Sequence, residues 1–178
     1  KILKISKVSD ELHSRFHAKK RVYRYLTSTK PTTPFSYKFI THIKNEIDEE
    51  LMKKAIKEYI GIFYFKYFHK TGSDKDITIR EIFDTSFYKY KDIYVFRFEA
   101  NSYLRSQIRL MVGFLLAINE NKLTVEDLRK QLRLEKNIFK TPAKANGLYL
   151  EIFSYFNFKI FFKKKKFYTL LDIKNQIV

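Results

Sequence analysis

Basic and aromatic side chains alternate through residues 18–25 with a period of two, the spacing that puts side chains on one face of a β-strand. The two faces are then Lys19, Arg21, Tyr23 and Tyr25 on one side, and Lys20, Val22 and Arg24 on the other. Cations beside aromatic rings can hold a phosphate backbone and stack an unpaired base. The pattern is equally typical of an amphipathic edge strand with solvated Lys and Arg, so this segment alone leaves both interpretations open.

Apolar residues spaced by three and four predict helices further along the chain. Asp48 is the expected N-cap of the first helix, with two acidic residues after it and a helix stop at Gly61. Thr124 and Asp127 form a capping-box pattern for another helix. Between them, residues 105–119 predict a helix whose apolar side carries Ile108, Met111, Val112 and Leu115.

Period-two alternation and short apolar runs predict strands at residues 2–7, 20–27, 77–90, 93–103 and 147–156. The third and fourth of these, joined near Lys91 and Asp92, predict an antiparallel hairpin. Residues 62–68 form an aromatic run that we expect to be buried. Several antiparallel strands with a few helices define an α+β fold. We expect a mostly antiparallel or mixed sheet with the helices packed on one face.

Composition narrows the function classes. The 178 residues suffice for one domain with a real core or for two small ones, and the net charge of +17 is typical of a nucleic-acid binder. Cysteine is absent, which excludes disulfides and thiolate chemistry. We find neither an apolar run long enough to cross a bilayer nor a signal peptide, and expect a cytoplasmic protein without a membrane partner. The spacing of the four histidines favours no metal site.

One arginine stands out in the helix predicted at residues 105–119. Arg105 and Arg109 are four residues apart, so a helix would place them on one face. Arg109 lies among apolar neighbours, and a partly desolvated guanidinium usually has an anionic partner. That partner is either a ligand or an ordinary structural carboxylate such as Glu99.

A second candidate site is the start of the strand predicted at residues 147–156. Gly147 could let the backbone approach a ligand while Leu148 forms an apolar wall, or both could belong to a core strand that follows a turn glycine. Motifs for binding nucleotide cofactors do not occur, and Gly72 lies in no phosphate-binding loop pattern. Asp74 and Asp76 fit a solvated turn better than a catalytic pair.

The order of these pieces resembles one enzyme family. Residues 10–25 are similar to the D-D-F-H-A-R-F-S-A…R-x-Y-R-Y segment of bacterial tRNA pseudouridine synthase A, with Leu12 in place of a phenylalanine. The resemblance continues in order to Phe156, and its further segments are Phe65–Phe68 (D-F-x-x-F), Arg80–Ile82 (R-T-I), Asn101–Gly113 (A-N-x-F-L-x-x-M-V-R-N-I-V-G) and Pro142–Leu150 (A-P-A-x-G-L-Y-L).

The resemblance implies a role for three residues. Tyr23 matches the tyrosine that stacks on the target uracil, Arg109 the arginine that pairs with the catalytic aspartate, and Leu148 a leucine of the uracil pocket. It implies a homodimer that needs no cofactor and isomerises uridine to pseudouridine in the tRNA anticodon stem-loop. The reaction breaks the N-glycosidic bond, turns the extruded base and rejoins it through carbon. Further RNA contacts are expected at Lys19, Lys20, Arg21, Arg24 and Arg105.

The sequence departs from the family at the nucleophile. The family's aspartate lies in an R-T-D-x-G-V-H-A motif, and no such motif occurs in these residues. We therefore expect it upstream of Lys1 and expect this chain alone to be inactive. The cleft is expected on the sheet face opposite the helices. Residues 1–156 are interpreted as the C-terminal domain of the enzyme, and residues 157–178 as a basic, aromatic extension that forms an extra strand with a short helix or a basic arm.

Two other functions fit the same sequence. The first is a non-catalytic RNA-binding domain that keeps the basic, aromatic strand, and the second is a basic structural or ribosome-associated protein. Replacing Tyr23 by alanine separates them, because only a base-stacking role predicts a loss of RNA affinity.

Overall fold

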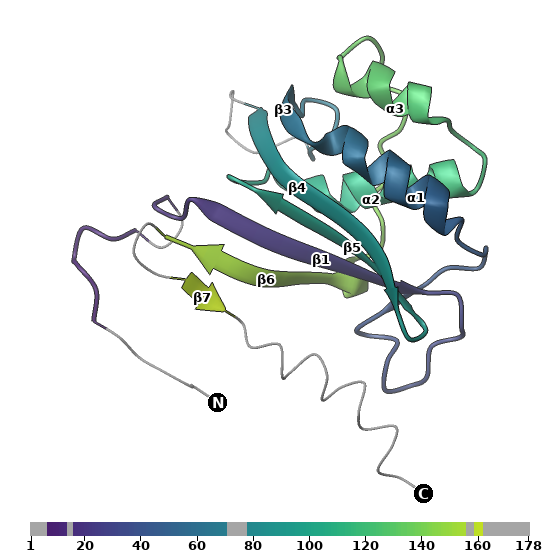
Figure 1. Cartoon of the computed structure of the whole chain (residues 1–178), viewed down its shortest axis with the longest axis horizontal. Helices are drawn as coiled ribbons and strands as arrows, with labels where there is room; N and C mark the ends of the chain where they lie inside the picture. The colour runs from purple at the N-terminus through teal and green to yellow at the C-terminus, as the bar shows by residue number, and fades with distance from the viewer. Residues whose placement is uncertain (1–6, 14–15, 71–77, 156–158, 162–178) are drawn as a thin grey trace, which may run out of the picture.

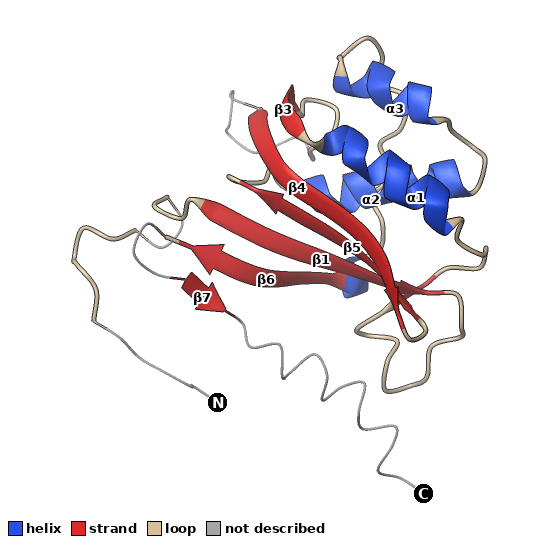
Figure 2. Ribbon diagram, viewed as in Figure 1, coloured by secondary structure: helices blue, strands red, loops and turns tan. Residues whose placement is uncertain are grey.

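The computed structural model describes residues 7–13, 16–70, 78–155 and 159–161. Within these ranges, seven strands form one mixed sheet in the order β3-β4-β5-β1-β6-β7, with β2 parallel to the end of β1 (Figure 1, Figure 2). The strands are β1 (Lys20–Ser28), β2 (Thr41–His42), β3 (Gly61–Tyr64), β4 (Ile79–Tyr90), β5 (Ile93–Ala100), β6 (Leu148–Ser154) and β7 (Lys159–Phe161). This confirms the predicted α+β fold.

The helices begin at the predicted caps. Asp48 accepts a hydrogen bond of 2.9 Å from the Leu51 amide at the start of α1 (Glu49–Ala55), which continues as the 3₁₀ helix η1 (Ile56–Tyr59). Thr124 and Asp127 form a complete capping box for α3 (Val125–Leu132). These local predictions are confirmed because a cap depends only on residues three positions apart.

The helix α2 (Gln107–Asn119) begins later than predicted. Its N-cap Ser106 has a φ of 63°, a left-handed conformation that turns the chain before the first helical residue. Arg105 therefore lies outside the helix and does not share a helical face with Arg109, so that prediction is wrong. The predicted apolar side is confirmed: it is buried along its whole length, at Ile108, Met111, Val112 and Leu115.

The main core lies between the helices and one face of the sheet. It is rich in aromatic rings, and those with no more than 1% exposure include Tyr25, Tyr59, Phe65, Phe68, Phe96, Phe98 and Phe114. The helices cluster near β3, β4 and β5, whereas β6 and β7 lie at the end of the sheet away from them (Figure 1). This leaves the neighbourhood of β1 and β6 for a site.

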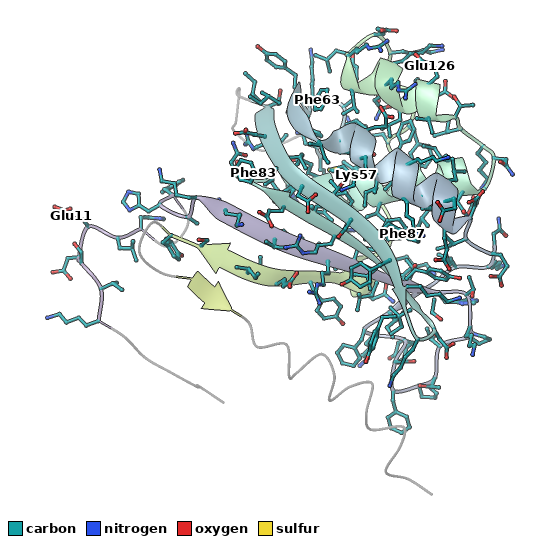
Figure 3. The ribbon with its side chains drawn as sticks, viewed as in Figure 1. Glu11, Lys57, Phe63, Phe83, Phe87 and Glu126 are labelled. Carbon is teal, nitrogen blue, oxygen red and sulfur yellow. The ribbon has the colours of Figure 1, made fainter. Side chains whose placement is uncertain are left out.

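The aromatic run at residues 62–68 is only half buried, so its prediction is corrected. β3 pairs with β4 at the outer end of the sheet, and Ile62 and Tyr64 are 67% and 56% exposed there. Phe63 and Phe83 are labelled at this end in Figure 3. Phe65, which follows the strand, and Phe68 lie in the core, and Phe63 packs against it.

The hairpin prediction is confirmed, with β4 and β5 antiparallel and Lys91 in the left-handed turn conformation, φ 53°. Of the predicted extension, β7 pairs with β6 as an extra strand of the same sheet. The predicted strand at residues 2–7 lies outside the described residues except for its last position, and so do Asp74, Asp76 and residues 162–178.

Candidate functional site

Tyr23 lies in the middle of β1, half-buried against the main core. Its ring meets the ring of Tyr103 edge-on, at 5.2 Å between centroids and 87° between planes. An edge-to-face neighbour fixes the plane of the Tyr23 ring. Burial raises the pKa of the Tyr23 phenol above 10.0, so the side chain is neutral at physiological pH. A neutral, oriented ring suits base stacking.

Arg109 lies in the first turn of α2 and is partly exposed. Its Nε donates a hydrogen bond of 2.6 Å to the Ala143 carbonyl, and the Ala143 amide donates one of 2.8 Å to the Arg109 carbonyl. Within the described part of the chain no carboxylate pairs with Arg109, and Glu99 is bound instead by Lys20 and Arg97. The interpretation of Arg109 as a structural ion pair with Glu99 is therefore wrong.

Tyr25 connects the pieces of this site. Its hydroxyl donates to the Lys144 carbonyl at 2.7 Å, one residue beyond the carbonyl that holds Arg109. Tyr25 also faces Leu148 across the β1–β6 pairing. Burial raises the pKa of the Tyr25 phenol, while its hydrogen bond with Thr41 and the positive charge of Arg109 act in the opposite direction. Tyr25 thus ties the strand to the segment that carries Arg109.

Leu148 and Tyr23 both pack against the core cluster that contains the residues of α2. Tyr23 and Leu148 therefore lie on the face of the sheet against which the helices pack, and Arg109 lies on one of those helices. This corrects the expectation that the cleft lies on the opposite face. The alternation within β1 is as predicted, but the aromatic side of the strand points toward the helices.

Gly147 is required by packing inside the protein. A Cβ at this position would lie 2.6 Å from the Leu26 carbonyl oxygen of β1 and 2.9 Å from Oγ1 of Thr41. Contacts below 3 Å are not tolerated without movement. This packing, at the end of a short 3₁₀ turn before β6, accounts for Gly147 without a ligand, and an approach of a ligand to its backbone stays a prediction.

The cations predicted to contact RNA separate into different environments. On the face away from the helices, Lys20 pairs with Glu99 at 2.5 Å and the Nε of Arg24 donates to Glu151 at 2.8 Å. Arg21 donates to two backbone carbonyls, those of Ala18 and Asn101. Lys19 and Arg105 are exposed. Contact of any of these five with RNA stays a prediction.

A cleft of about 310 Å³ opens beside Arg109. It is lined by His69, Lys70, Ser106, Arg109, Leu110, Lys140 and Pro142. Sequence reasoning missed Lys70 and Lys140, which are 70 positions apart in a chain with 36 Lys and Arg residues. Nothing in their local sequence distinguishes them, and only the packing of α2 against the segment around Ala143 brings them to one cleft.

Neither a metal nor a membrane site is found in the part of the chain that the structure describes. Among these residues no group of three or more His, Asp or Glu side chains could hold a metal ion. None of the helices in the same ranges is long and apolar enough to cross a membrane.

The α+β fold thus links the strand of Tyr23, the backbone that holds Arg109, and Leu148 through the single side chain of Tyr25. A family model described as tRNA pseudouridine synthase matches residues 55–155. The chain belongs to this family. The matched range includes Arg109 and Leu148, whereas Tyr23 precedes it.

Curated relatives point to one branch of the family. The chain is 37% identical over 150 residues to tRNA pseudouridine synthase A of Wolinella succinogenes, covering 84% of this chain and 59% of the relative. It is also 37% identical to the enzyme of that name from Campylobacter jejuni strain RM1221, over 86% of this chain and 64% of the relative. The Streptococcus agalactiae enzyme is 32% identical, with 84% and 60% covered. The chain thus spans about three fifths of the length of these relatives.

Proposed function

We propose that this chain is the uridine-holding part of a tRNA pseudouridine synthase A, which isomerises uridine to pseudouridine in the anticodon stem-loop. One observation carries the proposal: Tyr25, two residues after Tyr23 on β1, pairs across the sheet with Leu148 and donates to the backbone segment that holds Arg109. These are the three residues that the family resemblance assigns to the target nucleotide. The net charge of +17 suits a polyanionic substrate.

In the proposed site each side chain has a physical task. The Tyr23 ring, held edge-on by Tyr103, stacks on the extruded uracil. Leu148 covers the apolar side of the pocket. The guanidinium of Arg109 is fixed through Nε by the Ala143 carbonyl, so its two remaining nitrogens point to an anion in a set direction.

We propose that this anion is the nucleophilic aspartate, supplied by sequence outside these 178 residues. The relatives are longer than the matched region, and the family's R-T-D-x-G-V-H-A motif does not occur here. The chain alone is then inactive, and activity requires an upstream segment. We likewise propose that the extended protein is a homodimer, and sedimentation velocity tests this.

The first experiment measures pseudouridine in an unmodified tRNA transcript after incubation with this chain and with a form extended upstream to include the aspartate motif. We expect pseudouridine only with the extended form, and expect its Asp→Ala variant to be inactive. Product from the 178-residue chain alone would contradict the proposed origin of the nucleophile. If the extended form binds tRNA but produces no pseudouridine, the chain is a non-catalytic RNA-binding domain instead.

Base stacking by Tyr23 predicts a specific loss of affinity. Tyr23→Ala should weaken binding of the unmodified anticodon stem-loop by about 1–3 kcal/mol, roughly fivefold to 150-fold. Fluorescence anisotropy measures this directly. Tyr64→Ala is the matched control, because Tyr64 is an exposed tyrosine at the far end of the sheet. Equal affinities of the two variants would favour a basic structural protein.

A further inference from the structure

Cationic side chains line the cleft beside Arg109. Of its seven lining residues, Lys70, Arg109 and Lys140 are cationic, and none is acidic. The structure shows no ion pair for any of the three within the residues it describes. Elsewhere in the described residues, Lys20, Arg97 and Arg129 contact carboxylates. Among the residues that the structure describes, no carboxylate lines the cleft, and its lining therefore has a local positive potential.

The start of α2 adds to this potential. Ser106 lies at the N-terminal end of this 13-residue helix and lines the cleft, and its side chain makes no capping hydrogen bond. The first turn of the helix contains no acidic residue. A helix N-terminus without a carboxylate presents backbone N–H groups and the positive end of the helix dipole. Together with three cations in one cleft, it fits a ligand with several anionic oxygens.

We propose that Lys70, Lys140 and the α2 N-terminus form a binding subsite for one backbone phosphate of the RNA, next to the nucleotide held by Tyr23 and Leu148. This rests on the proposed function. Arg109 lies in the same cleft and, on that proposal, faces the nucleophilic aspartate. A strand whose base is turned out toward Tyr23 must bring its phosphate close to the same face, and the two exposed lysines then neutralise that charge.

Two features favour a phosphate over an acidic side chain of the protein. A phosphodiester accepts hydrogen bonds from ammonium groups and from backbone N–H groups at the same time. The cleft, at about 310 Å³, is also larger than one carboxylate requires and open to an extended strand. Lysine suits this role, since it binds phosphate as a point charge without needing a fixed planar geometry.

The test uses the 178-residue chain and an unmodified anticodon stem-loop RNA at a series of KCl concentrations. Lys70→Gln with Lys140→Gln should weaken binding several-fold and lower the slope of log K against log [KCl] by about 0.7, the value for one phosphate contact on a single strand. Lys54→Gln is the control, because Lys54 is exposed on α1 and does not line the cleft. The three lysines replaced in these variants are exposed, so the fold should be unaffected. Equal melting temperatures of the variants and the native chain check this.

A second probe identifies the phosphate. In this probe, each stem-loop carries a single uncharged methylphosphonate at a different linkage around the target uridine. With the native chain, affinity should fall when the methylphosphonate replaces one particular phosphate. With the double variant, the same replacement should cause no further loss of affinity. Additive losses at every linkage, or a salt slope equal to that of Lys54→Gln, would overturn the subsite. Both readouts measure binding, so they succeed or fail independently of pseudouridine formation by the extended form.

Discussion

Cations on the face of the sheet away from the helices and cations in the cleft beside Arg109 differ in their partners. On that face of the sheet, Glu151 accepts from both Arg24 and Arg97, at 2.8 and 3.2 Å from their Nε atoms. In the cleft, Lys70 and Lys140 are among the lining residues, and none of the described lining residues is acidic. Net charge alone does not separate these regions. A cation that is already paired with a carboxylate attracts a phosphate only weakly, whereas a cation without a neighbouring carboxylate attracts it more strongly.

The two sides of the strand at residues 18–25 have different surroundings in the folded protein. Their aromatic side contributes Tyr23 and Tyr25 to the core and the proposed site. Their other side contributes Lys20 and Arg24 to an ion network with Glu99 and Glu151. The interpretation of this segment as an edge strand with solvated cations is wrong, because β1 lies between β5 and β6 and Arg24 is mostly buried in its ion pair. Base stacking by the aromatic side stays a prediction.

The largest expected effect on stability comes from adding a side chain where α2 contacts the backbone segment around Ala143. A Cβ on Gly113 of α2 would lie 2.2 Å from the Thr141 carbonyl oxygen and 3.1 Å from the Ala143 amide. Alanine normally favours a helix over glycine by about 1 kcal/mol. Here we expect Gly113→Ala to destabilise the protein by about 3 kcal/mol, because backbone must move. Urea unfolding measures the free energy.

The same variant tests the cleft as a unit. The displaced backbone contains the Ala143 carbonyl that fixes Arg109 and follows Lys140 directly. RNA affinity of the folded fraction should therefore fall more than it does for the Lys54→Gln control. Stability equal to or above that of the native chain would show that the segment around Ala143 moves freely, contrary to this account of Arg109.

A smaller effect is expected from breaking the ion pairs of Glu151 with Arg24 and Arg97 on the face of the sheet away from the helices. Glu151→Gln leaves Arg24 and Arg97 without their shared carboxylate, although both are mostly buried, at 17% and 20% exposure of the side chain. We expect a loss of about 1.5 kcal/mol in the free energy of unfolding. RNA binding at low salt should become tighter, since the surface gains positive charge. Weaker binding by the folded variant would mean that the intact network itself contacts RNA.

The smallest effect concerns an exposed pair. Hydrogen bonds from Arg129, 2.8 and 2.9 Å long, and the charge of that guanidinium lower the pKa of Glu58 below 4.5. A lowered carboxyl pKa stabilises the fold above the unfolded value, and the contribution is lost as the pH falls below about 4.5 through the folded value. Arg129→Gln should lower the free energy of unfolding slightly at pH 7 and leave it unchanged at low pH. Unfolding at pH 7 and pH 3 checks this, and RNA affinity should change little.

Local chemistry determined much of this protein from sequence. The caps at Asp48 and Thr124 and the β4–β5 hairpin depend on residues a few positions apart, and the structure has them where the pattern predicted. Arg109 and Leu148 were singled out by ordered motifs, and the family to which those motifs pointed is the one that residues 55–155 match. Alternation also fixed which side chains of β1 share a face, because a strand has only two.

Tertiary structure decided what each of those faces meets. Alternation assigns residues to a side, but only the packing of α2 determined that the aromatic side of β1 points toward the helices. The position of β3 at the end of the sheet left Ile62 exposed despite its apolar surroundings in sequence. The cleft joins Lys70 and Lys140 across 70 positions, and contacts between residues so distant in sequence depend on the whole fold rather than on any local pattern.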